Sequence, residues 1–318
     1  MIATRSDEDL LTALRLAHSE WRALLALVEA ALLEIERPEW RESVPAPAPR
    51  DPESEPLLSG AILTVARRPI ERWVRRVLET AAGIGAAAPF VEPAATRRID
   101  PLALLQAAMA QDLARLDDIA SAAGDTHGVL RGVASLIAMP LLQACRRARA
   151  VPASGTWPHG YCPTCGAWPA LAEIRGLDGA RHLRCRGCGE DWPTAWLRCP
   201  FCGEHDHTRL GSLVAAGGLE REKIEVCDGC HGYLKTITTF GPIPAEQVVL
   251  HDLATVGLDV AAVERGYRPP TPRSPLAVQI VARRSAFRAL LSRGAFGMSR
   301  PGRQLQAGAG DWASDHSP

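Results

Sequence analysis

Residues 162–166 read Cys-Pro-Thr-Cys-Gly, residues 185–189 Cys-Arg-Gly-Cys-Gly, residues 199–203 Cys-Pro-Phe-Cys-Gly and residues 227–231 Cys-Asp-Gly-Cys-His. These four stretches decide the fold. Three of them end in glycine, which suits a turn that wraps its backbone N–H groups toward a thiolate sulfur and needs a residue with positive φ. The fourth carries His231 in that place. The sequence therefore predicts four pre-shaped ligand turns.

The spacing of the pairs predicts two metal sites. In a reducing compartment, clustered Cys-x-x-Cys pairs are more often metal sites than disulfides. Two pairs brought together by a hairpin give a tetrahedral four-sulfur site. Pairing in chain order assigns one ion to Cys162, Cys165, Cys185 and Cys188 and the other to Cys199, Cys202, Cys227 and Cys230. Nested pairing, with the second and third pairs sharing an ion, is the alternative.

Sulfur spacing does not separate iron from zinc, because both accept four thiolates. A closed four-sulfur shell leaves no position for water, so the metal is expected to be structural or an electron carrier rather than a Lewis acid. The ninth cysteine, Cys145, is expected to be a buried small apolar residue.

Length and charge bound the class of protein. The chain has 318 residues, with 36 Lys and Arg against 36 Asp and Glu. That length suggests more than one domain, and the neutral balance gives no overall field toward nucleic acid or acidic membranes. The N-terminus turns acidic where a secretory signal would be apolar, which favours a cytoplasmic location. The longest uncharged apolar stretch, residues 132–145, is short for a membrane span, so no membrane insertion is expected.

Periodicity predicts an α+β chain of several domains, beginning with an all-helical bundle over residues 1–155. Helical patterns cover most of residues 6–37, 59–82, 101–123 and 126–150, and Pro140 should kink or split the last of these. A packing helix is expected over residues 243–270. Residues 271–318 are expected to be a partly disordered tail, in which residues 278–293 form a weak basic amphipathic pattern.

Between these parts the strand pattern is duplicated. After Cys165 the chain reads as strand, turn and strand before Cys185, and the same order recurs between Cys202 and Cys227. A third strand can follow each unit, at residues 191–198 and 233–240. The sequence therefore predicts two tandem zinc-ribbon-like units, over residues 156–196 and 197–242, that abut.

Other chemistry is poorly supported. Residues 162–235 carry nine basic and ten acidic side chains, and eight thiolates with two divalent ions make the region more negative, which disfavours nucleic acid as a partner. Five nearby histidines are expected at the surface or beside the ligands, because eight cysteines already complete two shells: His159, His182, His205, His207 and His231. We find no phosphate-binding loop, nucleophile elbow or His-Glu-x-x-His pattern, so no enzyme activity is expected.

With these motifs in view, a family resemblance emerges. The run from Trp157 to Gly166, the later three cysteine pairs and Leu234-Lys235 resemble the formate dehydrogenase accessory proteins of FdhE type. Residues 139–145 and 252–259 are similar too, and the likeness is dense from about residue 125 to 270. The resemblance implies a cytoplasmic, non-catalytic helper with two rubredoxin-like iron sites, formed by the same eight cysteines. Its implied partner is the catalytic subunit of a respiratory formate dehydrogenase before export. The alternative is a structural zinc-ribbon interaction module without a redox role, and the oligomeric state stays open.

Overall fold

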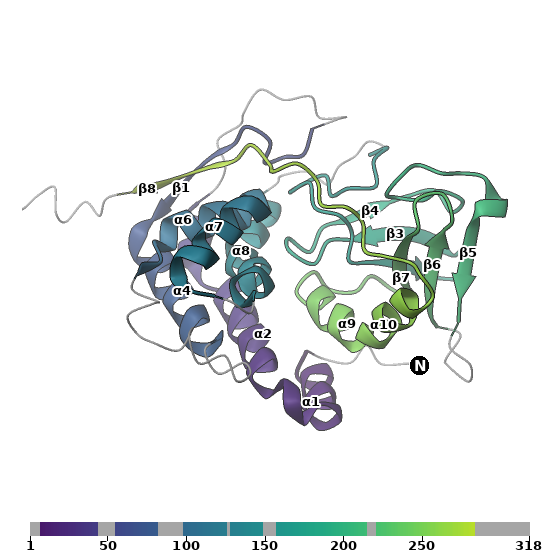
Figure 1. Ribbon diagram of the computed structural model, residues 1–318, viewed down its shortest axis with the longest axis horizontal. Coiled ribbons are helices and arrows are strands. Elements are labelled where there is room, and N and C mark those ends of the chain that lie inside the picture. The colour runs from purple at the N-terminus through teal and green to yellow at the C-terminus, as the bar shows by residue number, and fades with distance from the viewer. Residues whose placement is uncertain are drawn as a thin grey trace, which may run out of the picture. The chain divides into compact units, whose positions relative to one another are not determined.

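The computed structural model describes residues 7–43, 55–81, 98–125, 128–148, 157–214 and 221–283. The N-terminal part contains α1 (Asp7–Ala17), η1 (Ser19–Trp21), α2 (Arg22–Ile35), α3 (Pro38–Arg41), α4 (Arg67–Ala81), α6 (Pro101–Ala110), α7 (Leu113–Ala123) and α8 (Val129–Arg147). Helix α8 packs against α2, α4, α6 and α7, as Figure 1 shows. This arrangement buries most of α8 and makes it the central helix of the part.

Helix α8 is long and apolar enough to cross a membrane by length and composition alone. However, 72% of its apolar window is buried inside the structure, as expected for the core helix of a globular protein. Pro140 lies inside this helix, which runs unbroken from Val129 to Arg147. Of the two outcomes expected for Pro140, the split helix is wrong, and the kink stays a prediction. The neighbouring helices pack around this segment and stabilise it although one backbone donor is missing.

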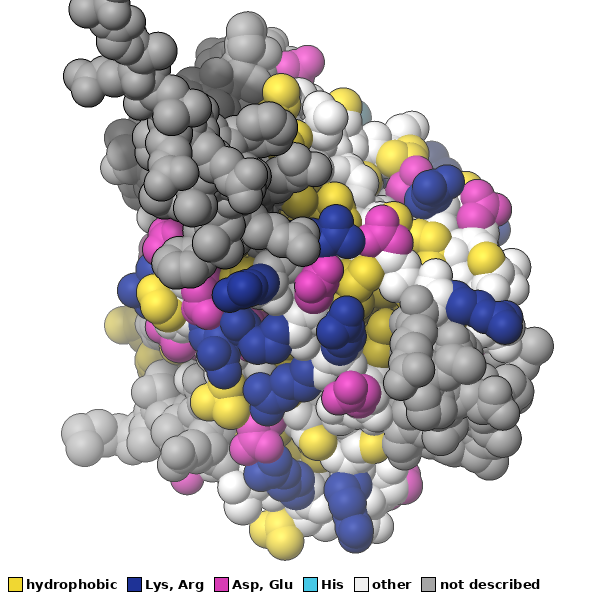
Figure 2. All heavy atoms as spheres, turned by 90° about the vertical axis from the view of Figure 1, so that its left-hand side faces the viewer, with side chains coloured by type: hydrophobic (Ala, Val, Ile, Leu, Met, Phe, Trp, Pro, Cys, Tyr) yellow, Lys and Arg dark blue, Asp and Glu magenta, His cyan; other side chains and the backbone are white. Residues whose placement is uncertain are grey.

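The outer side of α4 is basic. Its exposed side chains include Arg67, Arg68, Arg72, Arg75 and Arg76. Figure 2 looks onto this side of the molecule and shows Lys and Arg side chains gathered among acidic ones. The buried carboxylate of Glu34 on α2 forms an ion pair with Arg72 at 2.7 Å. It also accepts a hydrogen bond from the Trp40 indole at 3.0 Å. Glu34 therefore joins α2, α3 and α4.

The N-terminal part is not all-helical. Residues 62–66, expected in a helix, form β1 (Ile62–Ala66), which pairs in parallel with β8 (Gln279–Arg283). Leu63 and Val65 are buried while Ile62 and Thr64 are exposed, which is the alternation of a strand. The partly disordered tail expected over residues 271–318 is wrong for residues 279–283, which form this strand, and residues 284–318 lie outside those described. A partner more than 200 residues away decides both strands.

Three further expected helices are divided. The helix expected over residues 101–123 breaks at Gln111, which has a φ of 56°, and Asp112 caps α7 by accepting from the Arg115 N–H at 3.0 Å. The C-terminal packing helix is two short helices, α9 (Val248–Ala254) and α10 (Val256–Glu264), separated at Thr255. The N-terminal helix is also interrupted, because His18 adopts non-helical angles and stacks on Trp21 with ring centroids 3.7 Å apart.

The cysteine-rich part forms one six-stranded sheet in the order β4-β3-β2-β7-β6-β5. Its strands are β2 (Leu171–Arg175), β3 (Ala180–Arg184), β4 (Asp191–Pro193), β5 (Leu210–Leu213), β6 (Glu222–Cys227) and β7 (Gly232–Thr239). The strands β2, β3 and β4 form one antiparallel meander, and β5, β6 and β7 form a second. The parallel pair β2 and β7 joins them, with Leu171 opposite Lys235.

One hydrophobic core continues from the helices into the sheet. It includes Leu142 of α8 and Ile280 of β8. It also includes the four cysteines of the first two Cys-x-x-Cys pairs, and each of these cysteines is 1% exposed or less. Helix α10 packs against β6 and β7 (Figure 1). The side chain of Lys235 on β7 reaches these helices, with Nζ 2.6 Å from Asp252 and 2.8 Å from Asp259. The shared core thus joins the N-terminal helices to the cysteine-rich part, and the ion pairs of Lys235 join α9 and α10 to the sheet. The predicted domain limits stay predictions.

Candidate metal centre

Three of the four cysteine turns share one hydrogen-bond pattern. The N–H of each glycine donates to the carbonyl of the first cysteine of its pair, at 2.9 Å for Gly166, 2.9 Å for Gly189 and 3.0 Å for Gly203. These glycines have φ values of 73°, 72° and 79°, in the left-handed region. The fourth turn has the same backbone sign with a different residue, since His231 has a φ of 55°. The local sequence therefore shapes all four turns alike.

The sulfurs gather into two groups of four. We call Cys162, Cys165, Cys185 and Cys188 the first group, and Cys199, Cys202, Cys227 and Cys230 the second group. Within each group the sulfur atoms all lie within 4.8 Å of one another. The grouping follows chain order, and the nested alternative is excluded because the pairs at 185/188 and 199/202 belong to different groups.

Sulfur separations in both groups fit a tetrahedral metal site. They are 3.4 Å between Cys162 and Cys188, 3.5 Å between Cys165 and Cys185, and 3.8 Å between Cys199 and Cys230. A metal bonded to four thiolates at about 2.3 Å holds neighbouring sulfurs about 3.8 Å apart, whereas a disulfide requires about 2.05 Å. All nine cysteines are free in this structure. Each group could therefore hold one metal ion.

The two groups differ in burial. Every cysteine of the first group is buried, with exposures of 1% or less. In the second group Cys199 and Cys227 are buried, Cys230 is half-buried and Cys202 is exposed. The first group thus lies inside the protein, and the second opens to the surface on one side.

Burial and neighbouring groups shift the thiol pKa values. Burial raises the pKa of Cys162 and Cys188 well above the ordinary thiol value, and it raises the pKa of Cys230 to about 11. For Cys202, burial acts upward, but the backbone N–H of Glu204 and the neighbouring thiols bring the pKa below its usual value. Thiolate is the form that binds metal, so metal binding at Cys162 and Cys188 must displace protons.

The histidines near the cysteine turns make contacts outside the two sulfur groups. Among the described residues, neither group of candidate ligands contains a histidine. His182 lies 2.7 Å from the carboxylate of Asp191, and His159 stacks against Tyr161 with ring centroids 4.8 Å apart. Cys145 is buried, as expected, and burial followed by the nearby Cys165 raises the pKa of its thiol to about 12.

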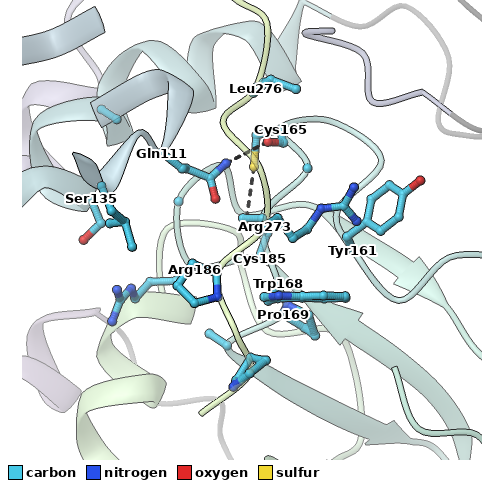
Figure 3. Close-up of a pocket in the computed structure, with 18 of the residues that line it drawn as sticks. Gln111, Ser135, Tyr161, Cys165, Trp168, Pro169, Cys185, Arg186, Arg273 and Leu276 are labelled. Carbon is cyan, nitrogen blue, oxygen red and sulfur yellow. Dashed lines mark hydrogen bonds between the residues drawn. The ribbon is translucent and has the colours of Figure 1, made fainter. Parts of the chain in front are cut away.

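A cavity of about 750 Å³ adjoins the first group. Its lining includes the first ligand turns, α8 and an extended segment of residues 269–277. Figure 3 shows Gln111 beside Cys165, and Arg273 of that segment against Tyr161. The guanidinium carbon of Arg273 lies 3.3 Å from the centre of the Tyr161 ring, and the Trp168 indole donates to the Thr271 carbonyl at 2.9 Å. These contacts hold the extended segment beside the ligand turns.

Sequence reasoning missed the residues that support the first group from outside it. Gln111 Nε2 donates to the Cys165 carbonyl at 2.8 Å, and the Thr164 hydroxyl donates to the Glu190 carboxylate. Thr164 stands inside a cysteine turn, so a polar side chain there was a usable signal. Gln111 carries no such signal, because it lies 54 residues from Cys165 along the chain.

Comparison with known proteins connects this arrangement to one family. The protein FdhE homologue of Stutzerimonas stutzeri is 34% identical over 119 residues, and that of Shewanella baltica is 35% identical over 115 residues. Protein FdhE of Escherichia coli is 31% identical over 161 residues. Over these segments the chain is similar to FdhE proteins.

The matched segments cover only part of each chain. They comprise 36% of this chain and 38% of the Stutzerimonas FdhE homologue, and 48% of this chain and 51% of Escherichia coli FdhE. The chain thus spans about half or less of the length of the curated FdhE relatives that it matches. A crystal structure of the FdhE protein from Pseudomonas aeruginosa aligns with 84% of this chain and 89% of its own, at 22% identity and a TM-score of 0.49. No family model matches the chain.

Proposed function

We propose that this chain is a non-catalytic accessory factor for the maturation of a respiratory formate dehydrogenase, and that it binds the catalytic subunit of that enzyme. One observation carries the proposal: a chain that is 31–35% identical to FdhE proteins over segments of 115–161 residues holds two groups of four sulfurs. A closed shell offers no ligand position at which a substrate could bind a metal, which agrees with a helper rather than an enzyme.

We further propose that all eight cysteines bind metal, as two rubredoxin-like iron sites in tandem units beside an N-terminal helical domain. Iron held by four thiolates supplies one-electron redox chemistry or a deliverable ion, depending on access. The residues of this chain supply thiolate charge, turns whose N–H groups face sulfur, and burial. Thr164, for example, directs its N–H to Cys162 Sγ at 3.4 Å.

Protein is the partner class that the chain's charge favours. The whole chain carries no net charge, and the cysteine-rich region is slightly acidic before its thiolates are counted. This balance repels a phosphate backbone rather than attracting it. A catalytic subunit awaiting export would be met in the cytoplasm, which is where we propose that this chain acts.

The test is a deletion of the gene in its own host. Formate dehydrogenase activity should fall while the catalytic subunit is still synthesised, because the proposed defect lies in maturation. Restoring the chain with Cys199→Ser should leave activity low, whereas Cys145→Ser, a cysteine outside both groups, should restore it. An anaerobic pull-down on the chain should recover the catalytic subunit. Full activity in the deleted strain, or a pull-down without that subunit, contradicts the proposal.

A structural zinc-ribbon interaction module without a redox role is the second candidate, because zinc satisfies the same sulfur geometry. Metal analysis after anaerobic purification separates the two. Iron-loaded protein should be red when oxidised, from sulfur-to-iron charge transfer, and should bleach on reduction. Recovery of zinc alone from iron-replete anaerobic cells would favour the interaction module.

A further inference from the structure

The two cysteine groups have the same chemistry but very different surroundings. The first group belongs to the hydrophobic core that it shares with the helices. The second group lies at the other end of the sheet. Its Cys199–Cys202 turn comes before β5, and its Cys227–Cys230 turn comes at the end of β6. This difference bears on which group can release an ion.

Residues of the N-terminal part donate hydrogen bonds to the main-chain carbonyls of the Cys162–Cys165 turn. The Gln111 amide donates to the Cys165 carbonyl at 2.8 Å. The Leu58 N–H donates to the Thr164 carbonyl at 3.0 Å, so this turn is bonded to two separate segments of the N-terminal part. Opening the turn would break both contacts and expose apolar core.

Close packing holds the other turn of the first group. A Cβ atom added at Gly187 would lie 3.1 Å from Leu142 of α8, and one added at Gly189 would lie 2.5 Å from Ala245. Backbone and side chains therefore meet this turn on two sides. A cavity adjoins the turns of Cys165 and Cys185, but all four cysteines are 1% exposed or less, so an incoming donor atom could reach their sulfurs only after part of this core opens.

The Cys199–Cys202 turn of the second group packs on one side against the segment at Gly160, but both turns of this group also reach the surface. An added Cβ at Gly203, which follows Cys202, would meet nothing within 4 Å. The carbonyl of His231 accepts from the Arg268 N–H at 2.8 Å, and Tyr267 donates to Asp228 at 2.8 Å. His231 and Asp228 are both exposed. Cys202 is already exposed and Cys230 is half-buried, so less of the structure has to open to reach these two sulfurs than to reach the first group.

The carboxylates of Glu204, Asp206 and Asp228 and the guanidinium of Arg209 lie on or beside the turns of the second group. Glu204 lies beside the fourth turn, because a Cβ at Gly229 would be 3.1 Å from its carboxylate and 3.4 Å from Cys227 Sγ. Arg209 neutralises Glu204 at 2.7 Å, while Asp206 and Asp228 add further negative charge at the surface. Negative charge at an open rim raises the local concentration of cations.

We propose that the second group is the site where this protein exchanges a thiophilic divalent metal ion with its surroundings, while the first group keeps its ion as a permanent part of the fold. This rests on the metal binding proposed above. In the exchange, an incoming donor such as an acceptor's thiolate forms a bond to the ion as the bond from Cys202 breaks. The electron pair stays on the Cys202 sulfur, which takes a proton from water, and the ion's oxidation state does not change.

Metal release from the full chain, loaded with two zinc ions, tests the proposal. On mixing with the chelator pyridylazoresorcinol, one equivalent should leave fast and the second at least about tenfold more slowly, since it requires core opening. In Cys202→Ser the fast equivalent should disappear and the slow one remain. Release of both ions at one rate, or loss of the slow equivalent in Cys202→Ser, overturns the proposal.

Alkylation of the unmutated, zinc-loaded protein gives a second readout that does not depend on a variant's folding. N-ethylmaleimide should modify Cys202 and Cys230 first and the four cysteines of the first group last, as followed by peptide mass spectrometry. Equal rates in both groups contradict the assignment. Binding of fewer than two zinc ions per chain would instead contradict the proposed metal sites themselves, so the two failures are distinguishable.

Discussion

The side-chain amide of Gln111 donates a 2.8 Å hydrogen bond to the main-chain carbonyl of Cys165, across 54 residues of sequence. Gln111 is the C-cap of α6, with a φ of 56° that glycine or asparagine more often adopts at this position. The turn that ends α6 therefore points an amide at the first ligand turn. Helix termination and the candidate metal centre are coupled through one residue.

Gln111→Leu should destabilise the protein by about 1–2 kcal/mol, because the Cys165 carbonyl loses its donor in a half-buried setting. The same change should speed release of the slow zinc equivalent. Gln106→Leu is the matched control, since Gln106 bonds Val278 and Ile280 beside β8 rather than a cysteine turn. Denaturant unfolding and zinc release measure both variants, and equal release rates for the two would contradict the coupling.

Glu173→Gln should cost about 3–5 kcal/mol, because it leaves the buried guanidinium of Arg184 without its counter-charge, whereas Arg175 keeps Asp191 at 2.7 Å. Glu173 is fully buried, pairs with Arg184 and Arg175, and accepts the Ile243 N–H at 3.0 Å. Asp117→Asn is the control: it removes an exposed pair with Arg131 and should cost under about 1 kcal/mol. Denaturant titration measures the unfolding free energy of both variants. Similar losses of stability in the two would refute the larger effect expected for Glu173→Gln.

Gly160→Ala should destabilise the protein by about 1–3 kcal/mol, as expected for overpacking. A Cβ at Gly160 would lie 1.9 Å from the carbonyl oxygen of Pro200, so the segment before the first turn and the third turn must separate. Gly132→Ala, in α8, has open space around the new methyl group and should gain about 1 kcal/mol from helix propensity. Thermal unfolding of the two variants should therefore shift in opposite directions.

His231→Gly should stabilise the protein by about 1 kcal/mol, because relief of left-handed strain outweighs the entropy that glycine adds to the unfolded chain. Gly203→Ala occupies the same place in the third turn, with a φ of 79° and free space around the Cβ. That change should therefore lose stability through the backbone alone. Should His231→Gly weaken the protein instead, the imidazole itself contributes to the fourth turn.

Stability should fall as the pH rises above about 10, partly because of Tyr233. The Tyr233 hydroxyl donates a hydrogen bond to Asp259 at 2.9 Å. Burial, followed by the negative charge of Asp259, raises the pKa of Tyr233 above its ordinary value of 10.0. The unfolded chain therefore loses this proton before the folded chain does, which favours unfolding from pH 10 upward. Tyr233→Phe should reduce that loss. Denaturant midpoints across this pH range, compared between wild type and variant, provide the measurement.

The sequence by itself determined the local features of this protein. Four cysteine turns, the glycines after three of them, and the antiparallel meanders depend on contacts a few residues apart, so their spacing was sufficient to predict them. Asp100 accepts the Leu102 N–H at 3.1 Å and begins α6, as the proline after it indicated. Each of these features is a short-range hydrogen bond or a fixed φ, which the residue types themselves specify.

Only the tertiary structure decided the long-range pairs. Residues 62–66 became a strand because β8 supplied a partner, and the two meanders joined through β2 and β7 although β4 precedes the second unit along the chain. The same holds for the burial that separates the two cysteine groups: equal motifs differ because the helices cover one and leave Cys202 of the other exposed. Contacts between distant segments depend on which apolar faces meet, and a local pattern carries no record of that choice.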